Sequence, residues 1–237
     1  MGRGYPMKAI VLMSGGLDST TVLAYALKEG YEITGISFDY GQRHRIELES
    51  SKKIAEYYGI ARMVFKIDLT QIGGSSLTDN LEVEKGRISR DNIPNTYVPG
   101  RNIIFTSIAG GFADLHGADA IMLGVNAVDY SGYPDCRPEF ISSMEKALQT
   151  GLAKSSKLRI IAPLQRLSKA EIIRMGMELK APYQLTHSCY EGRKKACGEC
   201  DSCLLRLKGF MEAGYLDPVE YEKYPEFYSN YLKNKKN

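Results

Sequence analysis

The sequence predicts an α/β protein built on an open parallel sheet with helices on both faces. Short apolar runs alternate with stretches of helical periodicity through residues 1–125, and a glycine turn follows the first run. A chain of 237 residues is long enough to bury one such sheet. Because βα repeats cross over in the right-handed sense, their strands lie parallel and their helices cover both faces.

Each predicted element follows from its local pattern. Apolar runs that end in glycine or polar residues predict strands at 8–13, 32–38, 62–67, 120–125 and 158–164. Apolar residues spaced by three and four predict helices at 17–27, 46–58, 102–115, 138–152, 168–179 and 203–213. Ser168 and Glu171 form a capping box at the start of one of these helices. The segment 70–100 lacks periodicity, which is typical of a lid, a binding loop or a disordered segment.

Composition and charge exclude several classes of protein. Hydrophobic residues make up 43% and charged residues 25% of the chain, as in an ordinary globular protein. The net charge of +3 is no larger than the charge of three lysines in the tail, Lys233, Lys235 and Lys236. The rest of the chain is therefore near neutral, and no general nucleic-acid surface is expected. Acidic residues interrupt the apolar stretch 103–125, which argues against a membrane span, and the N-terminus lacks the pattern of a signal peptide. We therefore expect a cytoplasmic protein.

The turn Ser14-Gly-Gly-Leu-Asp-Ser19 predicts an anion site, most plausibly for phosphate. It lies where the first strand ends and the first helix begins, at the edge of the sheet where ligands bind. Gly15 and Gly16 let the backbone approach a ligand closely, and the N–H groups of the helix start point outward. The turn is neither a Walker loop nor a G-x-G-x-x-G motif. A tight turn with Asp18 as a first-turn acid is the plain alternative, and a metal-associated Asp18 is the functional one.

Four of the five cysteines are close together in the sequence. Cys189, Cys197, Cys200 and Cys203 follow the pattern C-x7-C-x2-C-x2-C, which supplies four thiolates for a tetrahedral Zn²⁺. An iron–sulfur cluster is the alternative, although no proline follows the last cysteine as it does in bacterial ferredoxins. Because four thiolates fill the coordination shell, we expect a structural metal. Residues 186–237 are thus predicted to form a zinc-binding region and tail after a main unit at 1–185.

Two polar segments predict a substrate site. Arg101 and Asn102 begin a helix, where the dipole disfavours a cation, so Arg101 is expected to face an anion. The loop 124–140 is rich in donors, acceptors and aromatic side chains, namely Asn126, Asp129, Tyr130, Ser131, Tyr133, Asp135 and Arg137. Such a loop can hold a planar, hydrogen-bonding heterocycle. An ordinary polar surface turn is the alternative.

The glycine turn resembles the pyrophosphate loop of the PP-loop ATP pyrophosphatases, in which a substrate oxygen attacks the α-phosphorus of ATP. The turn, "VPGRN" at 98–102, "SFDYGQRHRIELES" at 37–50, the loop 124–140 and the cysteine cluster together resemble the 7-cyano-7-deazaguanine synthase family. This resemblance implies an ATP-dependent ligase that forms C–N bonds. Its substrates would be 7-carboxy-7-deazaguanine and ammonia, and its nitrile product would serve queuosine or archaeosine synthesis. Two adenylations are implied, first of the carboxylate and then of the amide.

The resemblance also implies roles for individual residues. The residues implied to bind ATP, together with Mg²⁺, are Met13, Ser14, Gly15, Gly16, Leu17, Asp18, Ser19, Ser37 and Phe38, the last two near adenine. The residues implied to bind the substrate are Arg101, Asn102, Asp129, Tyr130, Tyr133, Asp135 and Arg137. Asp18, Arg101, Asp129 and Asp135 are the implied catalytic residues. The general base stays open among Asp129, Asp135 and His44.

Two other functions compete with this interpretation. A tRNA sulfurtransferase, another adenylating PP-loop enzyme, would use a persulfide cysteine such as Cys136, although buried cysteines are often only small hydrophobes. A zinc-containing nucleic-acid-binding module would leave the glycine turn and the loop 124–140 without a role. We expect small-molecule partners, no direct contact with nucleic acid or membrane, and a homodimer formed through the aromatic tail 221–231.

Overall fold

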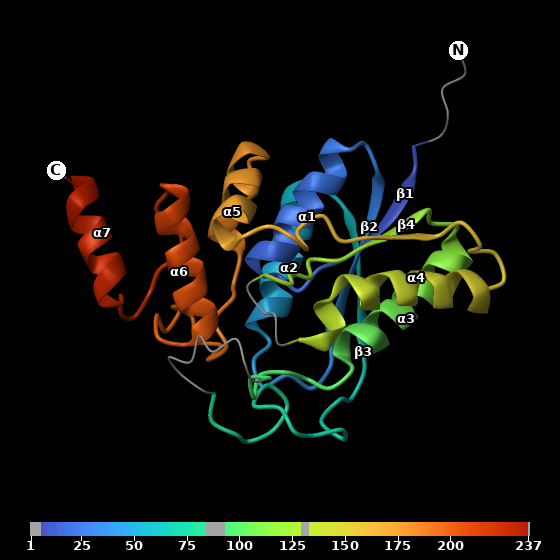
Figure 1. Ribbon diagram of the computed structural model, residues 1–237, viewed down its shortest axis with the longest axis horizontal. Coiled ribbons are helices and arrows are strands. Elements are labelled where there is room, and N and C mark those ends of the chain that lie inside the picture. Colours follow the sequence, from blue (N-terminus) through green and yellow to red (C-terminus); the bar gives the residue numbers. More distant parts are fainter. Residues whose placement is uncertain (1–5, 84–92, 129–132, 237) are drawn as a thin grey trace, which may run out of the picture.

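The computed structural model describes residues 6–83, 93–128 and 133–236, and it contains the predicted open parallel sheet (Figure 1). The strands are β1 Lys8–Leu12, β2 Glu32–Asp39, β3 Ala61–Lys66, β4 Ala120–Met122 and β5 Arg159–Ile161. The helices are α1 Leu17–Lys28, α2 Ile46–Tyr58, α3 Arg101–His116, α4 Pro138–Gly151, α5 Lys169–Glu178, α6 Asp201–Ala213 and α7 Glu226–Lys236. Short 3₁₀ segments lie at Pro134–Cys136 and Tyr183–Leu185.

Helices cover both faces of the sheet, as predicted. Side chains alternate along a strand, so β1 contributes Ala9 and Val11 to the apolar cluster beneath α1, α2 and α5. Ile10 of the same strand belongs to the second cluster, beneath α3 and α4. Figure 1 shows α3 and α4 on the opposite side of the strands from α1. Burial on both faces explains why β1 reads as a continuous apolar run rather than as an alternating pattern.

The strand order β3-β2-β1-β4-β5 places a topological switch between β1 and β4. The chain leaves β1 toward the face of α1, and it leaves β4 toward the opposite face, where α4 packs. The register pairs Val11 with Met122, so the two strands end at the same edge. Ligands of open parallel sheets bind in the crevice outside such a switch point. The glycine turn and residues 123–126 both lie there.

Most predicted elements are present, and the differences have local causes. The sequence predicts strands at 120–125 and 158–164, but β4 and β5 contain only three residues each. The Asn126 side chain donates hydrogen bonds to Leu164 O at 2.8 Å and to Leu167 O at 2.6 Å. These bonds hold the two chain segments in a loop arrangement instead of extending the sheet. Helix α7 was not predicted, because its few apolar residues, such as Phe227 and Leu232, are scattered among polar ones.

The C-terminal helices extend the layer of α1 and α5. Helix α6 packs against α5 and α7 packs against α6, so the three helices stand in a row (Figure 1). The predicted division of the chain into two parts, between residues 185 and 186, stays a prediction. One apolar cluster contains buried residues from both parts. None of the helices in the described part of the chain is long and apolar enough to cross a bilayer.

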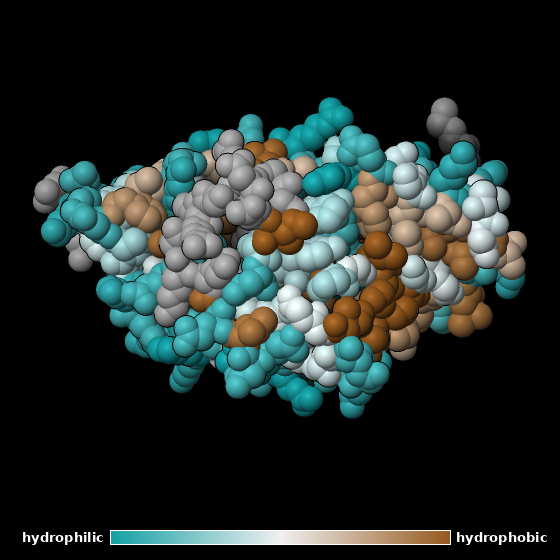
Figure 2. All heavy atoms as spheres, turned by 60° about the horizontal axis from the view of Figure 1, so that its bottom comes forward, coloured by the Kyte–Doolittle hydropathy of each residue, from teal (hydrophilic) through white to brown (hydrophobic). Residues whose placement is uncertain are grey.

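Apolar side chains also gather on part of the surface. Figure 2 shows them on the side of the molecule that carries β3 and α3. Met63 and Val64 of β3 are 44% and 43% exposed, and Ile103 of α3 is 46% exposed. Since β3 is an edge strand of the sheet, this surface is available for contact with another chain.

Candidate nucleotide and substrate site

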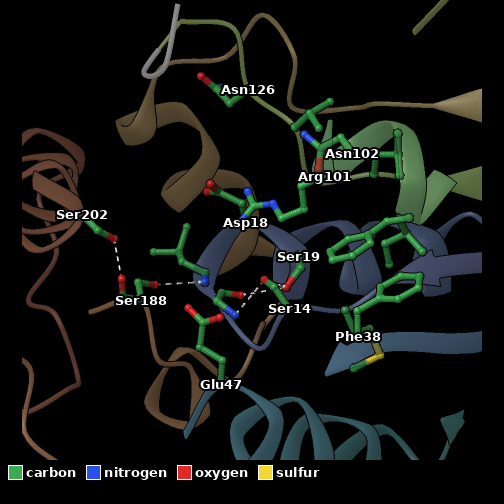
Figure 3. Close-up of a pocket in the computed structure, with 18 of the residues that line it drawn as sticks. Ser14, Asp18, Ser19, Phe38, Glu47, Arg101, Asn102, Asn126, Ser188 and Ser202 are labelled. Atoms are coloured by element: carbon green, nitrogen blue, oxygen red, sulfur yellow. Dashed lines mark hydrogen bonds between the residues drawn. The ribbon is translucent and has the colours of Figure 1, made fainter. Parts of the chain in front are cut away.

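A cavity opens at the switch point between β1 and β4, and the glycine turn forms one of its walls (Figure 3). Of the predicted site residues, it brings together Met13, Ser14, Gly16, Leu17, Asp18, Ser19, Phe38, Arg101, Asn102 and Tyr133. These residues come from the first half of the chain and from the loop after β4. The predicted segments therefore converge on one site, although they are widely separated in sequence.

The glycine turn is held by its own side chains. Gly15 has a φ of +87°, a left-handed conformation that favours glycine, and Gly16 is the N-cap of α1. Ser14 Oγ accepts a hydrogen bond from the Gly16 N–H group at 3.2 Å and lies 3.0 Å from Ser19 Oγ. The first N–H groups of a helix have no partner within the helix, and the helix dipole favours an anion beside them. The geometry of the turn suits the predicted phosphate.

Close packing leaves no room for side chains at two glycines of the site. A Cβ on Gly15 would come within 2.8 Å of the Ser51 backbone nitrogen in α2. A Cβ on Gly124, directly after β4, would come within 3.0 Å of the Ser19 backbone nitrogen. The turn is thus confined between α2 and the end of β4, which fixes its N–H groups before any ligand binds.

The segment before the first cysteine of the cluster covers the turn from outside. The His187 N–H group donates to Gly15 O at 2.9 Å, and the Leu17 N–H group donates to Ser188 Oγ at 3.4 Å. Ser202 Oγ in turn donates to Ser188 O at 2.6 Å (Figure 3). The region of the four cysteines therefore contacts the candidate nucleotide loop directly, a connection that the sequence did not reveal.

Arg206 of α6 holds the segment 186–188, which covers the glycine turn, in place. Its guanidinium forms two charge-assisted hydrogen bonds with Asp217, at 2.7 and 2.9 Å, and both side chains are almost fully buried. It also donates to Thr186 Oγ1 at 2.7 Å and to Ser188 Oγ at 3.3 Å. Burial acts to lower the pKa of Arg206, but Asp217 and Tyr221 raise it overall, so the guanidinium stays charged. Sequence reasoning missed Arg206, because nothing in the pattern of α6 distinguishes it.

Asp18 is already paired with a cation. Lys169 Nζ lies 2.8 and 2.9 Å from the two carboxylate oxygens of Asp18, and the pair is partly buried. Asp18 lies in the first turn of α1, so the plain alternative of a first-turn acid and the metal-associated interpretation both stay predictions. Lys169 lines the cavity and was not predicted, because it lies 151 residues away in sequence.

Aromatic side chains form the opposite wall of the cavity. Phe38 stacks on Phe105 with ring centroids 3.9 Å apart and an interplanar angle of 6°. The Arg101 guanidinium lies 6.0 Å from the centroid of the Tyr40 ring. Burial acts to lower the pKa of Arg101, but Tyr40 and Tyr133 raise it overall, so this side chain is a permanent cation in the cavity. A flat apolar surface beside a cation suits a planar, negatively charged ligand.

The loop before α4 contributes only part of the predicted substrate site. The Tyr133 hydroxyl pairs with Thr96 Oγ1 at 2.8 Å, and both residues line the cavity. Asp135 is buried behind the cavity, where its Oδ2 accepts from the Asn102 N–H group at 3.1 Å at the start of α3. Arg137 is exposed, precedes α4 and is not among the lining residues. In this structure Asp135 thus acts on Asn102, which does line the cavity.

Several other predicted residues lie outside the cavity lining. Ser37 is buried, and its Oγ donates to Met13 O at 2.7 Å, so it supports the turn from behind. His44 packs beside Gly192 and is not part of the lining. Asp129 and Tyr130, predicted as substrate-binding residues, lie outside the described residues.

Cys136 is the one cysteine among the described lining residues. Burial, reinforced by the neighbouring Asp135, raises the pKa of its thiol to about 12. The thiolate is the nucleophilic form of cysteine, so this thiol is unreactive near neutral pH. The environment of Cys136 does not favour the persulfide chemistry of a sulfurtransferase.

Glu47 is the second acid of the cavity besides Asp18 among the described residues. It belongs to the first turn of α2, and Figure 3 shows its carboxyl group pointing toward the glycine turn, between Ser188 and Ser14. Burial raises the pKa of Glu47 to about 7, and the charge of Arg101 opposes this shift in part. Glu47 was not predicted as a site residue, since it is one of several acids in the segment 37–50 and nothing in the sequence distinguishes it from them.

The four predicted cysteines converge at the start of α6. All four are buried, and their sulfur atoms lie within 4.8 Å of one another. Cys189 Sγ accepts from the Cys197 N–H group at 3.3 Å, and Cys197 Sγ accepts from the Cys200 N–H group at 3.3 Å. Zn–S bonds of about 2.3 Å in a tetrahedron need sulfur atoms at such mutual distances. The cluster can therefore hold one metal ion, and its donor set fits zinc.

A glycine turn joins the first strand and first helix of an open parallel sheet at the edge where ligands bind, so the fold and the site define this chain as an α/β protein with a candidate nucleotide-binding turn. The fold has a counterpart among solved structures. NMN synthetase from Francisella tularensis aligns with 97% of this chain and 85% of its own, with a TM-score of 0.50 and 13% sequence identity. At that identity the likeness concerns the fold alone.

Sequence comparison narrows the class to one family. The family described as queuosine biosynthesis protein QueC matches residues 8–214. The 7-cyano-7-deazaguanine synthase of Picrophilus torridus is 59% identical over 232 residues, which cover 96% of this chain and 97% of the relative. The 7-cyano-7-deazaguanine synthase of Thermoplasma acidophilum is 58% identical, covering 97% and 98%. The chain belongs to the QueC family of queuosine biosynthesis proteins.

Proposed function

We propose that this chain is an ATP-dependent ligase that converts 7-carboxy-7-deazaguanine and ammonia into 7-cyano-7-deazaguanine, for the synthesis of queuosine or archaeosine. The observation that carries the proposal is the near full-length match to relatives named 7-cyano-7-deazaguanine synthase, at 58–59% identity. The cavity supports it independently, because a glycine turn at a helix N-terminus lies beside a flat aromatic wall and a buried cation.

The glycine turn is proposed to bind the triphosphate of ATP. The substrate carboxylate attacks the α-phosphorus, and the N–H groups and hydroxyls of residues 14–19 stabilise the charge on the departing pyrophosphate. Ammonia then displaces AMP to give an amide, and the amide oxygen is adenylated by a second ATP before AMP leaves again. Mg²⁺ that accompanies ATP neutralises phosphate charge, and the Asp18 carboxylate, balanced by Lys169, is the group proposed to meet it.

The remaining lining residues are proposed to position adenine and the deazaguanine. Phe38 and the stacked Phe105 offer an apolar surface for adenine. Arg101 is the proposed partner of the substrate carboxylate, and Asn102 and Tyr133 offer polar groups to the heterocycle. Asp129 and Tyr130 are proposed as further substrate contacts. Asp135 is proposed to support Asn102 rather than to contact the substrate. Arg137 belongs to the same loop and is given no role in the site.

The four cysteines are proposed to hold a structural zinc ion. Cys189, Cys197, Cys200 and Cys203 would fill its coordination shell, so the ion would stabilise the fold around α6 rather than take part in the reaction. Free thiols in this number fit a reducing compartment, and we propose a cytoplasmic enzyme.

We also propose that the chain forms a homodimer. The predicted contact through the tail 221–231 must use exposed residues such as Tyr224 and Phe227, because Tyr221 and Tyr228 are buried within the protomer. The exposed apolar residues Met63 and Val64 on the edge strand offer a second surface. Sedimentation of the wild-type protein and of a Met63→Lys, Val64→Lys variant tests which surface is used.

One reaction mixture tests the proposed activity. The protein is incubated with ATP, ammonium and 7-carboxy-7-deazaguanine, and the products are analysed by mass spectrometry. We expect the nitrile together with AMP and pyrophosphate. Release of ADP and phosphate would contradict adenylation, and substrate-independent AMP release with sulfur transfer to tRNA would favour the sulfurtransferase instead.

A further inference from the structure

The proposed reaction needs a proton acceptor that the roles above do not supply. Near neutral pH most ammonia is present as ammonium, whose nitrogen has no free electron pair. The ion must lose a proton before it attacks the acyl adenylate, and a positioned acid–base group accelerates such a transfer. Among the described residues, the acids that line the cavity are Asp18 and Glu47.

These two acids differ in their electrostatic surroundings. Both carboxylate oxygens of Asp18 accept hydrogen bonds from Lys169, so this carboxylate is already engaged by a cation. Glu47 forms no ion pair in the described part of the chain. The other titratable or charged groups that line the same cavity are Tyr40, Arg101, Tyr133, Cys136, Lys169, His187, Tyr190 and Arg206. Arg206 is engaged by Asp217, and Cys136 is held as a neutral thiol.

The position of Glu47 links it to the leaving pyrophosphate. The backbone of Glu47 packs directly against Gly15, and the Glu47 carboxyl group points toward the glycine turn (Figure 3). A triphosphate on the turn therefore lies beside this carboxyl group, and its negative charge keeps the group protonated. When pyrophosphate leaves after adenylation, that charge is removed and the Glu47 carboxyl group releases its proton to water, which leaves a carboxylate. A space opens next to Glu47, from which ammonium can reach the adenylate.

We propose that Glu47 is the proton acceptor for ammonium in the space that pyrophosphate vacates. This inference rests on the proposed function. One N–H proton of ammonium passes to the Glu47 carboxylate, which leaves neutral ammonia with a free electron pair. The nitrogen forms the C–N bond at the acyl carbon, and the C–O bond to AMP breaks with its electron pair going to AMP. The nitrogen then releases its excess proton to water, and Glu47 returns its own proton to solvent before the next turnover.

The test separates adenylation from amide formation. Glu47→Gln keeps the size of the side chain and removes its basicity, and Glu49→Gln changes an exposed acid of the same turn as a matched control. Carboxylate-dependent exchange of labelled pyrophosphate into ATP, without ammonium, measures the first step. Amide and nitrile formation with ammonium measures the later steps. Thermal melting checks that each variant is folded.

We expect Glu47→Gln to retain pyrophosphate exchange within about threefold and to lose amide formation by about 100-fold or more at pH 7.5. Its residual rate should rise about tenfold per pH unit with the concentration of free ammonia, whereas the wild-type rate changes less between pH 7.5 and 8.5. Glu49→Gln should behave as wild type in both assays.

Three results would overturn the inference. If Glu47→Gln loses pyrophosphate exchange as strongly as amide formation, Glu47 serves nucleotide binding. If amide formation is unchanged, another group accepts the proton. If the wild-type protein itself shows no carboxylate-dependent exchange, the proposed function fails first, and this outcome is distinct because it does not involve the variant.

Discussion

Replacement of Arg206 by methionine should destabilise the protein severely. The Asp217 side chain is 1% exposed, and Arg206 is its cationic partner at 2.7 Å. Arg206→Met leaves this carboxylate buried with the Tyr221 hydroxyl and the Val219 N–H group as its remaining donors. Removal of one partner of a buried ion pair costs about 3–5 kcal/mol. For a chain of this size, that corresponds to a fall in Tm of about 6–20 °C.

Thermal and urea unfolding measure this loss, and a double variant tests its cause. Arg206→Met combined with Asp217→Leu removes both charges, so its free energy of unfolding should lie within about 2 kcal/mol of the wild type. The same variants report on function, since Ser188 loses a donor that holds it over the glycine turn. We expect ATP to bind more weakly to the single variant. A single variant that loses less than about 1 kcal/mol, or a double variant no more stable than the single one, would refute this reasoning.

Three further predictions concern the turn, the cluster and the free thiol. Gly15→Ala should weaken ATP binding about tenfold or more, measured by calorimetry, because the added Cβ meets the Ser51 backbone nitrogen. Gly30 has an equally left-handed backbone but open space around it, so the control variant Gly30→Ala should lose only about 1–2 kcal/mol of stability. Cys200→Ser should lower the zinc content from about one ion per chain toward zero in metal analysis and lower Tm, whereas a retained ion would contradict the assigned ligands. Cys136→Ser should keep nitrile formation within about threefold, since the pKa of the thiol is raised to about 12; a far larger loss of activity would return the sulfurtransferase to consideration.

The parts of the site that were predicted share a local origin. The turn at 14–19 and the cysteines at 189–203 are each contained in one short stretch, so residue type and spacing alone define their geometry. Helix α2 was predicted with the bounds that the structure shows, because Gly59 ends it in a left-handed conformation. Strands β4 and β5 were predicted too long, since the Asn126 side chain, rather than the apolar pattern, decides where the sheet stops.

The sequence by itself determined the class of sheet, the glycine turn, the cysteine cluster and the segments that surround the cavity, because each depends on neighbours within a few residues. Only the tertiary structure decided which charges meet. Lys169 reaches Asp18 across 151 residues, and Arg206 reaches Ser188 across 18 residues. Glu47 faces the turn and forms no ion pair with another described residue. Electrostatic roles depend on distance and burial in space, and the order of residues along a chain carries neither.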